Sequence, residues 1–340
     1  MTRNSRGCRL TNRWGGRLID KVPSSYVNVD RNSLGIMIVA VVLATTSAAC
    51  GAAAVPLDKV AAPVIETGDV ARFYKVYDAS GGRPTAEALQ RNYVDPGSDG
   101  LHELARRRKV TGQSIADAIA RRPEIYSKAR DCADTLPRVR ERLAVVMLKL
   151  GNLYPEARFP PITIAVGRGK PVGIGGRDTG VQIGLEALCA TDWINPDVEK
   201  RFVGVIAHEY VHVQQAVAFS EIENATVLAA SLEEGAAEFV TELTTGSISY
   251  AYMRGLTAGR EKEIETAFAA DAEKTDLSAW LYNSTPEQPA DLGYWVGYRI
   301  VKSYYQRAAD KRLAVRDILE MSNPKEFLVK SGWRPGIALN

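Results

Sequence analysis

The sequence predicts an α+β fold that is mainly helical, and three observations carry this prediction. Helical periodicity dominates residues 69–150, two short β-branched segments follow within residues 160–185, and helical patterns then return toward the C-terminus. Hydrophobic residues make up 46% and charged residues 24% of the 340-residue chain, which is an ordinary globular composition. We therefore expect one folded domain over residues 69–340, with a small sheet edge before a central buried helix.

The N-terminal segment differs from the rest of the chain. Residues 1–33 contain seven Lys or Arg and two Asp, and residues 34–49 are uncharged and end in small residues before Cys50. A positive region, an apolar core and a small-residue end are typical of a secretory signal. We expect residues 1–50 to be a basic leader with a signal or lipoprotein signal sequence, and residues 51–68 to be a flexible tether. The long basic leader puts the assigned start in doubt.

Three fates of this segment remain open. Ser47–Cys50 is similar to a bacterial lipobox, with Ser in its first position, and would leave a lipid and a membrane attachment at Cys50. Cleavage near Ala49 or Ala54 would free the protein, and without cleavage the uncharged run 34–57 is long enough to span a membrane. Each outcome places the remaining chain outside the cytoplasm, secreted or in the cell envelope.

The net charge narrows the possible binding partners, and two cysteines are candidates for a disulfide. The whole chain carries +3 and residues 1–33 carry 7 − 2 = +5, so residues 34–340 carry 3 − 5 = −2. This balance gives no electrostatic footprint for nucleic acid. Outside the leader, Cys132 and Cys189 either pair in an oxidising compartment or remain two free thiols.

The first half of the folded part reads as a series of helices. Breaks fall at Gly81-Gly82, Asp95–Gly97 and Arg122-Pro123. The run Arg106–Lys109 is interpreted as a solvated helix end, where positive charge is favourable. The predicted helices are Val70–Tyr77, Thr85–Tyr93, Gly100–Arg108, Ser114–Arg121 and Leu136–Leu150.

Two strands are predicted next. Ile162–Val166 and Val181–Leu185 alternate and are β-branched, and the Gly-rich link Gly167–Gly180 matches no complete nucleotide-binding fingerprint. We interpret them as a hairpin-like sheet edge with a flexible loop. An extended peptide could add to such an edge through main-chain hydrogen bonds.

The most specific motif is His208-Glu209-Tyr210-Val211-His212. Residues four apart lie on one face of a helix, so both imidazoles can reach one metal ion. This spacing suits Zn²⁺, with Glu209 close enough to take a proton from a water on the metal. The alternative is that both are core histidines and that Glu209 pairs with Lys200 or Arg201.

The flanking sequence predicts a buried helix for this motif. Asn195 is a plausible N-cap with Pro196 at the first helical position, and Val198–Phe219 contains no further Pro. Apolar residues cover most of its circumference, which predicts burial on all sides.

A catalytic zinc normally has three protein ligands, and the third must come from elsewhere. His102 is a poor candidate because it precedes a basic run. Downstream, Ser231–Leu243 has a helical pattern with Glu234 and Glu238 on the side opposite its apolar residues. We expect Glu234 to be the ligand and Glu238 to orient a histidine, with Glu233 and Glu238 as alternative ligands.

The last distinctive stretch is Leu292–Tyr305. Trp295, Ile300 and Tyr304 fit an aromatic helix packed in the core. Tyr294, Tyr298 and Arg299 can each donate a hydrogen bond to a developing oxyanion, so they are candidates for a catalytic role.

These residues together resemble a bacterial family of predicted zinc-dependent proteases, gluzincin-like and related to the gliding-motility lipoprotein B group. The resemblance includes the His-Glu-x-x-His motif and spans most of residues 69–333. It implies a zincin-like metalloprotease fold, with His208 and His212 as zinc ligands, Glu209 as acid/base and Glu234 as the third ligand. Further segments that carry it are Arg72–Asp78, Gly97–Leu101, Glu234–Ala237, Gly293–Ile300 and Glu326–Trp333.

The sequence thus predicts a zinc metallopeptidase that hydrolyses a peptide or protein substrate with Zn²⁺ as cofactor. Within the catalytic domain, we expect a helical part at 69–150, a zinc-site core at 160–245 and a helical part at 250–335. A cell-envelope lipoprotein that keeps the fold as a binding module and a zinc hydrolase of a non-peptide or cell-wall substrate are the alternatives. The sequence leaves cleavage specificity and oligomeric state open.

Overall fold

The computed structural model describes residues 63–170, 172–216, 224–285, 287–288 and 290–339. The chain divides into two units, Met1–Ala52 and Ala53–Asn340, and all described residues lie in the second. The predicted leader, the lipobox-like Cys50 and the start of the tether lie outside the described residues. None of the helices in the described part is long and apolar enough to cross a membrane.

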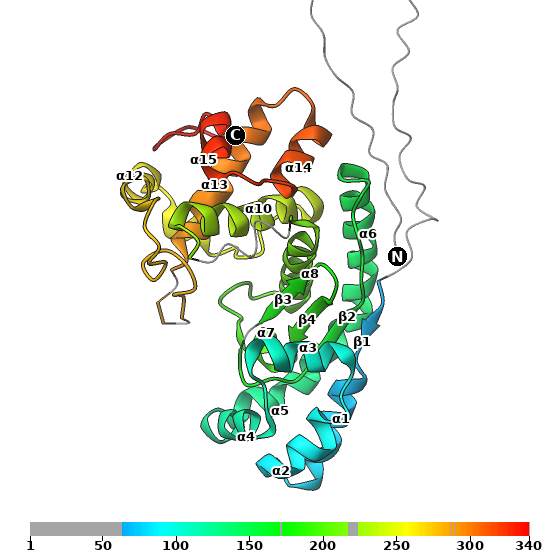
Figure 1. Cartoon of the computed structure of the whole chain (residues 1–340). Coiled ribbons are helices and arrows are strands. Elements are labelled where there is room, and N and C mark those ends of the chain that lie inside the picture. Colours follow the sequence, from blue (N-terminus) through cyan, green and yellow to red (C-terminus); the bar gives the residue numbers. More distant parts are fainter. Residues whose placement is uncertain (1–62, 171, 217–223, 286, 289, 340) are drawn as a thin grey trace, which may run out of the picture. The chain divides into compact units, whose positions relative to one another are not determined.

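The described part is mainly helical with one small sheet, which confirms the predicted α+β class (Figure 1). The strands are β1 (Ile65–Glu66), β2 (Ile162–Ala165), β3 (Gly173–Gly176) and β4 (Gly180–Gly184). The helices before the sheet core are α1 (Gly68–Ala79), α2 (Ala86–Leu89), the π-helix η2 (Gln90–Val94), α3 (Asp99–Arg108), α4 (Gly112–Arg121), α5 (Pro123–Cys132), the 3₁₀ helix η3 (Ala133–Thr135) and α6 (Leu136–Leu153). The later helices are α7 (Leu185–Ala190), α8 (Val198–Gln214), α10 (Val227–Thr245), α11 (Met253–Thr257), α12 (Glu261–Asp271), α13 (Leu292–Arg307), α14 (Lys311–Leu319) and α15 (Pro324–Ser331).

Side-chain caps define the N-terminal helices. The hydroxyls of Thr85, Ser98 and Thr111 accept hydrogen bonds from backbone N–H groups in the first turns of α2, α3 and α4. Ser114, the residue at which the sequence predicts a helix start, instead closes a capping box with Thr111. Helix α5 was not among the predicted helices, although Pro123 occupies its first turn, where proline is favourable.

The sheet has the order β1-β2-β4-β3, and its topology corrects the predicted hairpin. Strands β2 and β4 are parallel, with Ile162 opposite Val181, so no tight turn can join them. The Gly-rich link between them contains β3, which pairs antiparallel with β4 at the edge of the sheet. Strand β1, within the expected tether, extends the other edge by pairing with β2.

Helix α8 lies between two groups of buried residues. One group is built from the sheet and α1–α6 and includes Val205 and Ile206 of α8. The other is built mainly from α10, α13 and the C-terminal helices and includes Val211 of α8. Figure 1 shows α8 with the sheet on one side and α10 on the other. The predicted burial of this helix on all sides follows from contact with both groups.

Helices α10 and α13 cross at very short range. A Cβ atom on Gly297 of α13 would lie 1.7 Å from the carbonyl oxygen of Ser231 on α10, which no side chain can accept. This crossing brings the first turns of α13 beside the segment of α10 that contains Glu234.

Cys132 at the end of α5 and Cys189 in α7 form a disulfide, so the first of the two alternatives for these residues holds. The bond ties a helix that precedes the sheet to one that follows it.

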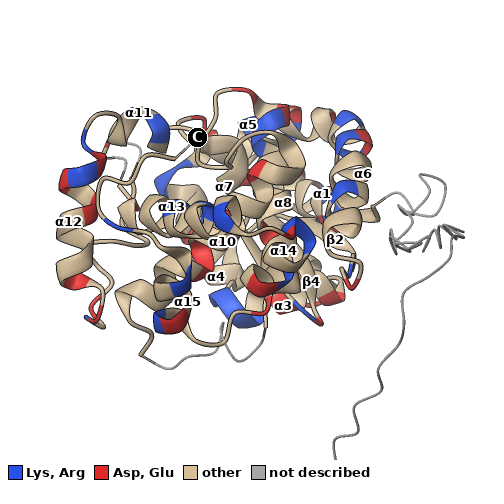
Figure 2. Cartoon of the chain, turned by 90° about the horizontal axis from the view of Figure 1, so that it is seen from above, with Lys and Arg blue, Asp and Glu red and all other residues tan. Residues whose placement is uncertain are grey.

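The outer helices carry charges of both signs. In Figure 2, Lys and Arg are interspersed with Asp and Glu along helices such as α5, α6 and α12. Such mixing is typical of solvent-facing helix surfaces.

Candidate metal centre

Helix α8 presents the His-Glu-x-x-His motif from its last two turns. The helix begins later than predicted: its N-cap is Asp197, whose side chain accepts a hydrogen bond from the Lys200 N–H. Asn195 lies outside the helix and accepts a hydrogen bond from the Asp197 N–H. The helix ends at Gln214, and residues 217–219 of the predicted helix lie outside the described part.

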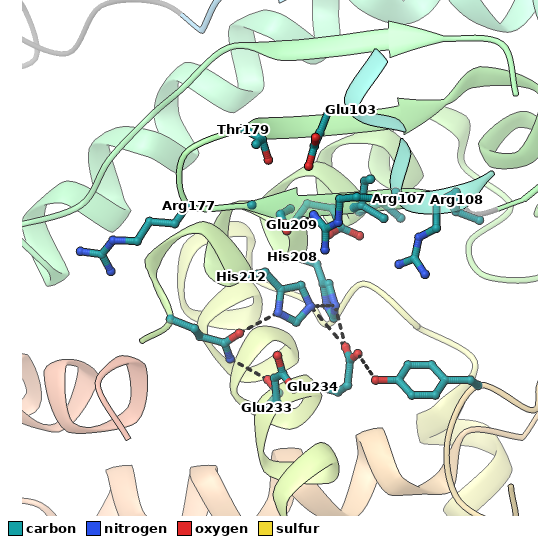
Figure 3. A pocket seen from close by; sticks show the side chains of 18 of the residues that line it. Glu103, Arg107, Arg108, Arg177, Thr179, His208, Glu209, His212, Glu233 and Glu234 are labelled. Carbon is teal, nitrogen blue, oxygen red and sulfur yellow. Dashed lines mark hydrogen bonds and ion pairs between the residues drawn. The ribbon is translucent and has the colours of Figure 1, made fainter. Parts of the chain in front are cut away.

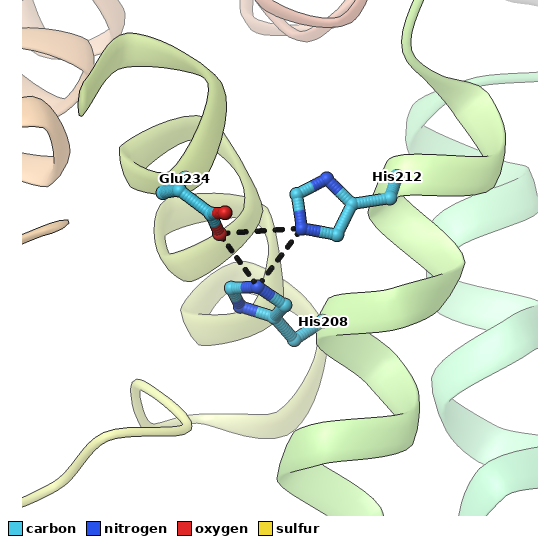
Figure 4. Close-up of side chains that lie close together, drawn as sticks. All are labelled: His208, His212 and Glu234. Atoms are coloured by element: carbon cyan, nitrogen blue, oxygen red, sulfur yellow. Dashed lines mark hydrogen bonds and ion pairs between the residues drawn. The ribbon is translucent and has the colours of Figure 1, made fainter. Parts of the chain in front are cut away.

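Three metal-binding atoms converge beside this helix. The Nε2 atoms of His208 and His212 are 3.0 Å apart, and Oε2 of Glu234 lies 3.2 Å from the first and 3.3 Å from the second (Figure 4). Tetrahedral ligands about 2.0–2.1 Å from a zinc ion are themselves separated by roughly 3.3 Å. Two imidazoles and one carboxylate at these separations therefore fit a zinc ion with an open fourth position.

The ring orientation of His208 is set by Glu238. The His208 Nδ1–H points at Oε1 of Glu238, 2.9 Å away, which leaves Nε2 free as a metal ligand. Glu238 is fully buried and also accepts hydrogen bonds from the backbone N–H and the hydroxyl of Ser249. Glu238 therefore has the geometry of an orienting residue, while Glu234 one turn earlier lies beside both Nε2 atoms.

His212 is oriented by a residue that the sequence did not indicate. Its Nδ1–H donates to Oε1 of Gln215 at 2.7 Å, and Nε2 of Gln215 donates to the backbone carbonyl of Glu233 at 2.8 Å. Gln215 thus fixes the His212 ring and ties the end of α8 to α10. The side chain of Glu233 lines the same pocket, and burial raises its pKa to about 7.

The charges of the three ligands stabilise one another. Burial acts to lower the pKa of His212, but the Glu234 carboxylate raises it to about 9. Burial likewise opposes protonation of His208, yet Glu234 and Glu238 raise its pKa well above the usual value. Burial acts to raise the pKa of Glu234, and the two histidines hold it well below its usual range. A metal ion binding here would displace protons from the histidines.

Glu209 lies next to these ligands, beneath the edge strand. The strand β3 passes so close to α8 that a Cβ atom on Gly175 would lie 2.2 Å from the Glu209 carbonyl oxygen. A Cβ atom on Gly173 would lie 2.7 Å from the Glu209 carboxyl. Burial raises the pKa of Glu209, and the nearby histidines oppose this rise. Its position beside the ligand set suits a carboxyl that exchanges a proton with a water there.

The competing interpretation of the motif does not fit the contacts. Lys200 pairs with Asp197, and the Arg201 guanidinium donates to the backbone carbonyls of Asn195 and Cys189, so neither pairs with Glu209. The ring of His102 is 3.0 Å from the Val94 carbonyl and does not line the pocket.

A pocket of about 860 Å³ opens over the histidines (Figure 3). Its wall includes β3, the end of α3 and three tyrosines, Tyr250, Tyr282 and Tyr294. The Tyr294 ring stacks near His208 with ring centroids 6.3 Å apart. The ligand set is therefore open to the pocket and bordered there by tyrosine side chains.

Tyr282 is a residue that the sequence reasoning missed. Its hydroxyl donates to Oε1 of Glu234 at 2.9 Å, so the phenol oxygen is turned into the site while much of the rest of the residue is exposed. Its backbone has φ of 59°, in the left-handed region that is unfavourable for a tyrosine. No motif or pattern in the sequence indicated this residue.

The other two candidates for an oxyanion donor lie away from the pocket. The Tyr298 hydroxyl donates to Glu242 at 2.7 Å, and Arg299 pairs with Glu265 and donates to the Ile337 carbonyl. Both residues follow Tyr294 on α13, but the helix turns them toward other partners. We correct the expectation accordingly and retain only Tyr294.

Neither the curated proteins nor the solved structures contain a match to the chain. The likeness to the gliding-motility lipoprotein B group stays a prediction. Residues 193–326, which contain the complete ligand set and the Tyr282 loop, match the model of a family described as predicted Zn-dependent protease.

Proposed function

We propose that this protein is a zinc metallopeptidase. The observation that carries the proposal is the convergence of the His208, His212 and Glu234 donor atoms at the floor of an open pocket, with the Glu209 carboxyl beside them. The orienting hydrogen bonds from both Nδ1 atoms support metal binding. A site whose only role was structural would need neither an open pocket nor Glu209.

Each residue has a role in the proposed reaction. When bound, zinc supplies Lewis-acid polarisation of the scissile carbonyl and lowers the pKa of a water. Glu209 takes a proton from the attacking water and delivers it to the leaving amine. The raised pKa of Glu209 suits both transfers, because the carboxyl can hold the proton between them.

The pocket also offers donors for the oxyanion. Tyr294 and Tyr282 border the ligand set, and burial raises the pKa of both phenols, so each keeps its proton. Tyr282 is the better placed of the two, because its hydroxyl already lies at hydrogen-bond distance from a ligand oxygen. If the Tyr282 hydroxyl turned from Glu234 to the oxyanion, it would form a hydrogen bond that exists only in the transition state.

The edge strand β3 is the proposed binding site for the peptide backbone. Among the described strands β3 pairs only with β4, so no other strand covers its second edge, where the Gly175 carbonyl accepts a hydrogen bond from Arg107. An extended substrate can pair with that edge and present its carbonyl to the metal position.

We propose that the protein acts outside the cytoplasm, secreted or held in the envelope by a lipid on Cys50. The disulfide between Cys132 and Cys189 supports this compartment, because such bonds persist in oxidising surroundings.

The test compares the purified protein with its Glu209→Gln variant. We expect about one zinc per chain in both, and loss of hydrolysis of a mixed peptide library by roughly 10²–10⁴-fold in the variant. Bound zinc with no cleavage by either protein would exclude peptidase activity and favour a binding module or a non-peptide substrate. Absence of zinc from both would refute the proposed metal site.

A further inference from the structure

The run Arg106–Lys109 forms the exposed C-terminal end of α3, as the sequence predicted, and its three arginines also border the pocket. Helix α3 packs on the sheet so closely that a Cβ atom on Gly100 would overlap the side chain of Thr163 in β2. This packing directs the C-terminal turn of α3 to the edge strand, where Arg106, Arg107 and Arg108 line the pocket. A second basic element, Arg177, follows β3 directly and lines the pocket too.

The arginines of this wall differ in how far their charge is already neutralised. Arg106 forms two hydrogen bonds with Glu103, at 2.7 and 2.9 Å, so its charge is paired. Arg107 donates to the Gly175 carbonyl at 3.2 Å, which fixes it against β3 and leaves its charge uncompensated. Arg108 makes no side-chain hydrogen bond or ion pair with any residue that the structure describes.

Arg108 is directed toward the reacting groups. Arg108 lines the same pocket as Glu209 and Tyr282, and in Figure 3 its side chain extends from the strand side toward the ligand set. Figure 3 shows Arg107 and Arg108 on the strand side of the histidines and Glu233 and Glu234 on the helix side. The unpaired positive charge and the acidic ligand set therefore occupy opposite walls.

We infer that Arg108, with Arg107 beside it, forms a subsite for a carboxylate on the substrate peptide. This inference rests on the proposed function, because a peptide paired with β3 would pass directly beneath these guanidinium groups. A guanidinium can bind a carboxylate through two parallel N–H bonds, which gives both affinity and orientation. The carboxylate is either an acidic side chain near the scissile bond or the free C-terminus of the peptide.

The experiment measures both binding and cleavage with matched peptides. Zinc-loaded Glu209→Gln protein is titrated with fluorescent peptides that carry Glu or Gln at single positions, each with a free or an amidated C-terminus. We expect the preferred carboxylate to tighten binding about 5–10-fold, the size of one partly exposed charge-assisted hydrogen bond. A preference for Glu over Gln identifies a side-chain carboxylate, and a preference for the free terminus identifies a C-terminal one.

Variants of the wall then assign the preference to its residues. Adding Arg108→Gln should remove most of the preference, and Arg108→Lys should keep only the part that is lost at high ionic strength. Arg121→Gln is the matched control, because Arg121 is an exposed arginine in the last turn of another helix and does not line the pocket. A preference that is unchanged in Arg108→Gln, or equally reduced in the Arg121 control, would overturn the inference.

The cleavage assay separates this inference from the proposed function. If the active protein cleaves neutral and acidic peptides equally well, and binds them equally, the carboxylate subsite is wrong while the peptidase stands. If no peptide is cleaved but the binding preference depends on Arg108, the subsite stands and the proposed peptidase is wrong.

Discussion

Removing the Glu238 carboxylate should weaken zinc binding without any direct contact to the metal. Glu238 is fully buried on α10 and accepts hydrogen bonds from His208 and from the backbone N–H of Ser249, the latter at 2.8 Å. In Glu238→Ala the His208 Nδ1–H loses its acceptor, so the ring can rotate and its Nε2 atom becomes less basic. Loss of such an orienting residue typically costs 10–100-fold in metal affinity, which corresponds to about 1.4–2.7 kcal/mol.

The structure also predicts how the conservative variant behaves. In Glu238→Gln the amide oxygen can still accept from His208, but the amide NH₂ must then face the Ser249 N–H, so one donor is left unpaired. We expect a smaller loss of zinc affinity, near the lower end of the range, and a loss of stability of about 1–3 kcal/mol for the unpaired buried group.

The assay is competition for zinc against a chromophoric chelator, with thermal unfolding to confirm that each variant is folded. Glu242→Gln is the matched control: Glu242 is the next acidic residue of α10, one turn further on, and it contacts Tyr298 and Arg254 away from the pocket. If folded Glu238→Ala binds zinc within about threefold of the native protein, or if Glu242→Gln weakens binding as much, orientation of His208 by Glu238 is refuted.

Three further predictions concern other parts of the fold. Replacing Cys132 and Cys189 by Ser removes a link across 57 residues, which should lower the free energy of unfolding in urea by about 4 kcal/mol; a loss below about 1 kcal/mol would contradict this. Gly175→Ala should push β3 away from the Glu209 carbonyl, so we expect stability to fall by about 1–3 kcal/mol and zinc affinity to fall with it, whereas an unchanged melting temperature would exclude the close contact. Burial raises the pKa of Glu186 above 4.5, so the stability that this group contributes is present at lower pH and is lost as pH rises through its folded pKa. Melting temperatures measured across pH should therefore decline less in Glu186→Gln than in the native protein, and an identical decline would refute this.

Most helices were predictable from local sequence, because their signals are local. The helical periods of α1, α3, α6 and α8 are each expressed within one segment, and caps such as Ser98 lie one residue before the helix. The errors at helix ends arise where two residues compete for the cap. At α8, Asn195 and Asp197 can both act as N-caps, and it is Asp197 that takes the role in the structure.

The edge strand was not predictable, because its reason lies in another element. Gly173, Gly175 and Gly176 have no side chains to produce a β pattern, and glycine is unfavourable in strands. Gly175 is required because β3 runs against the backbone of α8, and Gly173 lies against the Glu209 side chain; spacing along the chain does not encode these contacts. The sequence favoured a flexible loop for this segment, but its middle residues form strand β3.

The ligand set was predictable only where its residues share one helix. Spacing within one helix places His208 and His212 together, and spacing within another relates Glu234 to Glu238. Which acid of α10 faces α8 depends on the angle between the helices, so Glu233 and Glu238 remained open as alternatives. The position of Tyr282 was not predictable from nearby sequence. Its left-handed backbone and its hydrogen bond to Glu234 arise from a loop that is closed at its base by Asn283 and Asp291.

The candidate metal centre lies where the two groups of core residues meet, and this explains why its parts come from distant segments. Helix α8 contributes apolar residues to both groups, and it carries His208 on the side that faces α10. From the sheet side, β3 closes over Glu209, and from the other side the crossing at Gly297 brings α13 and Tyr294 against the ligands. A zinc ion held here would join α8 to α10 in addition to their packing, so its binding energy would also stabilise the junction between the two groups.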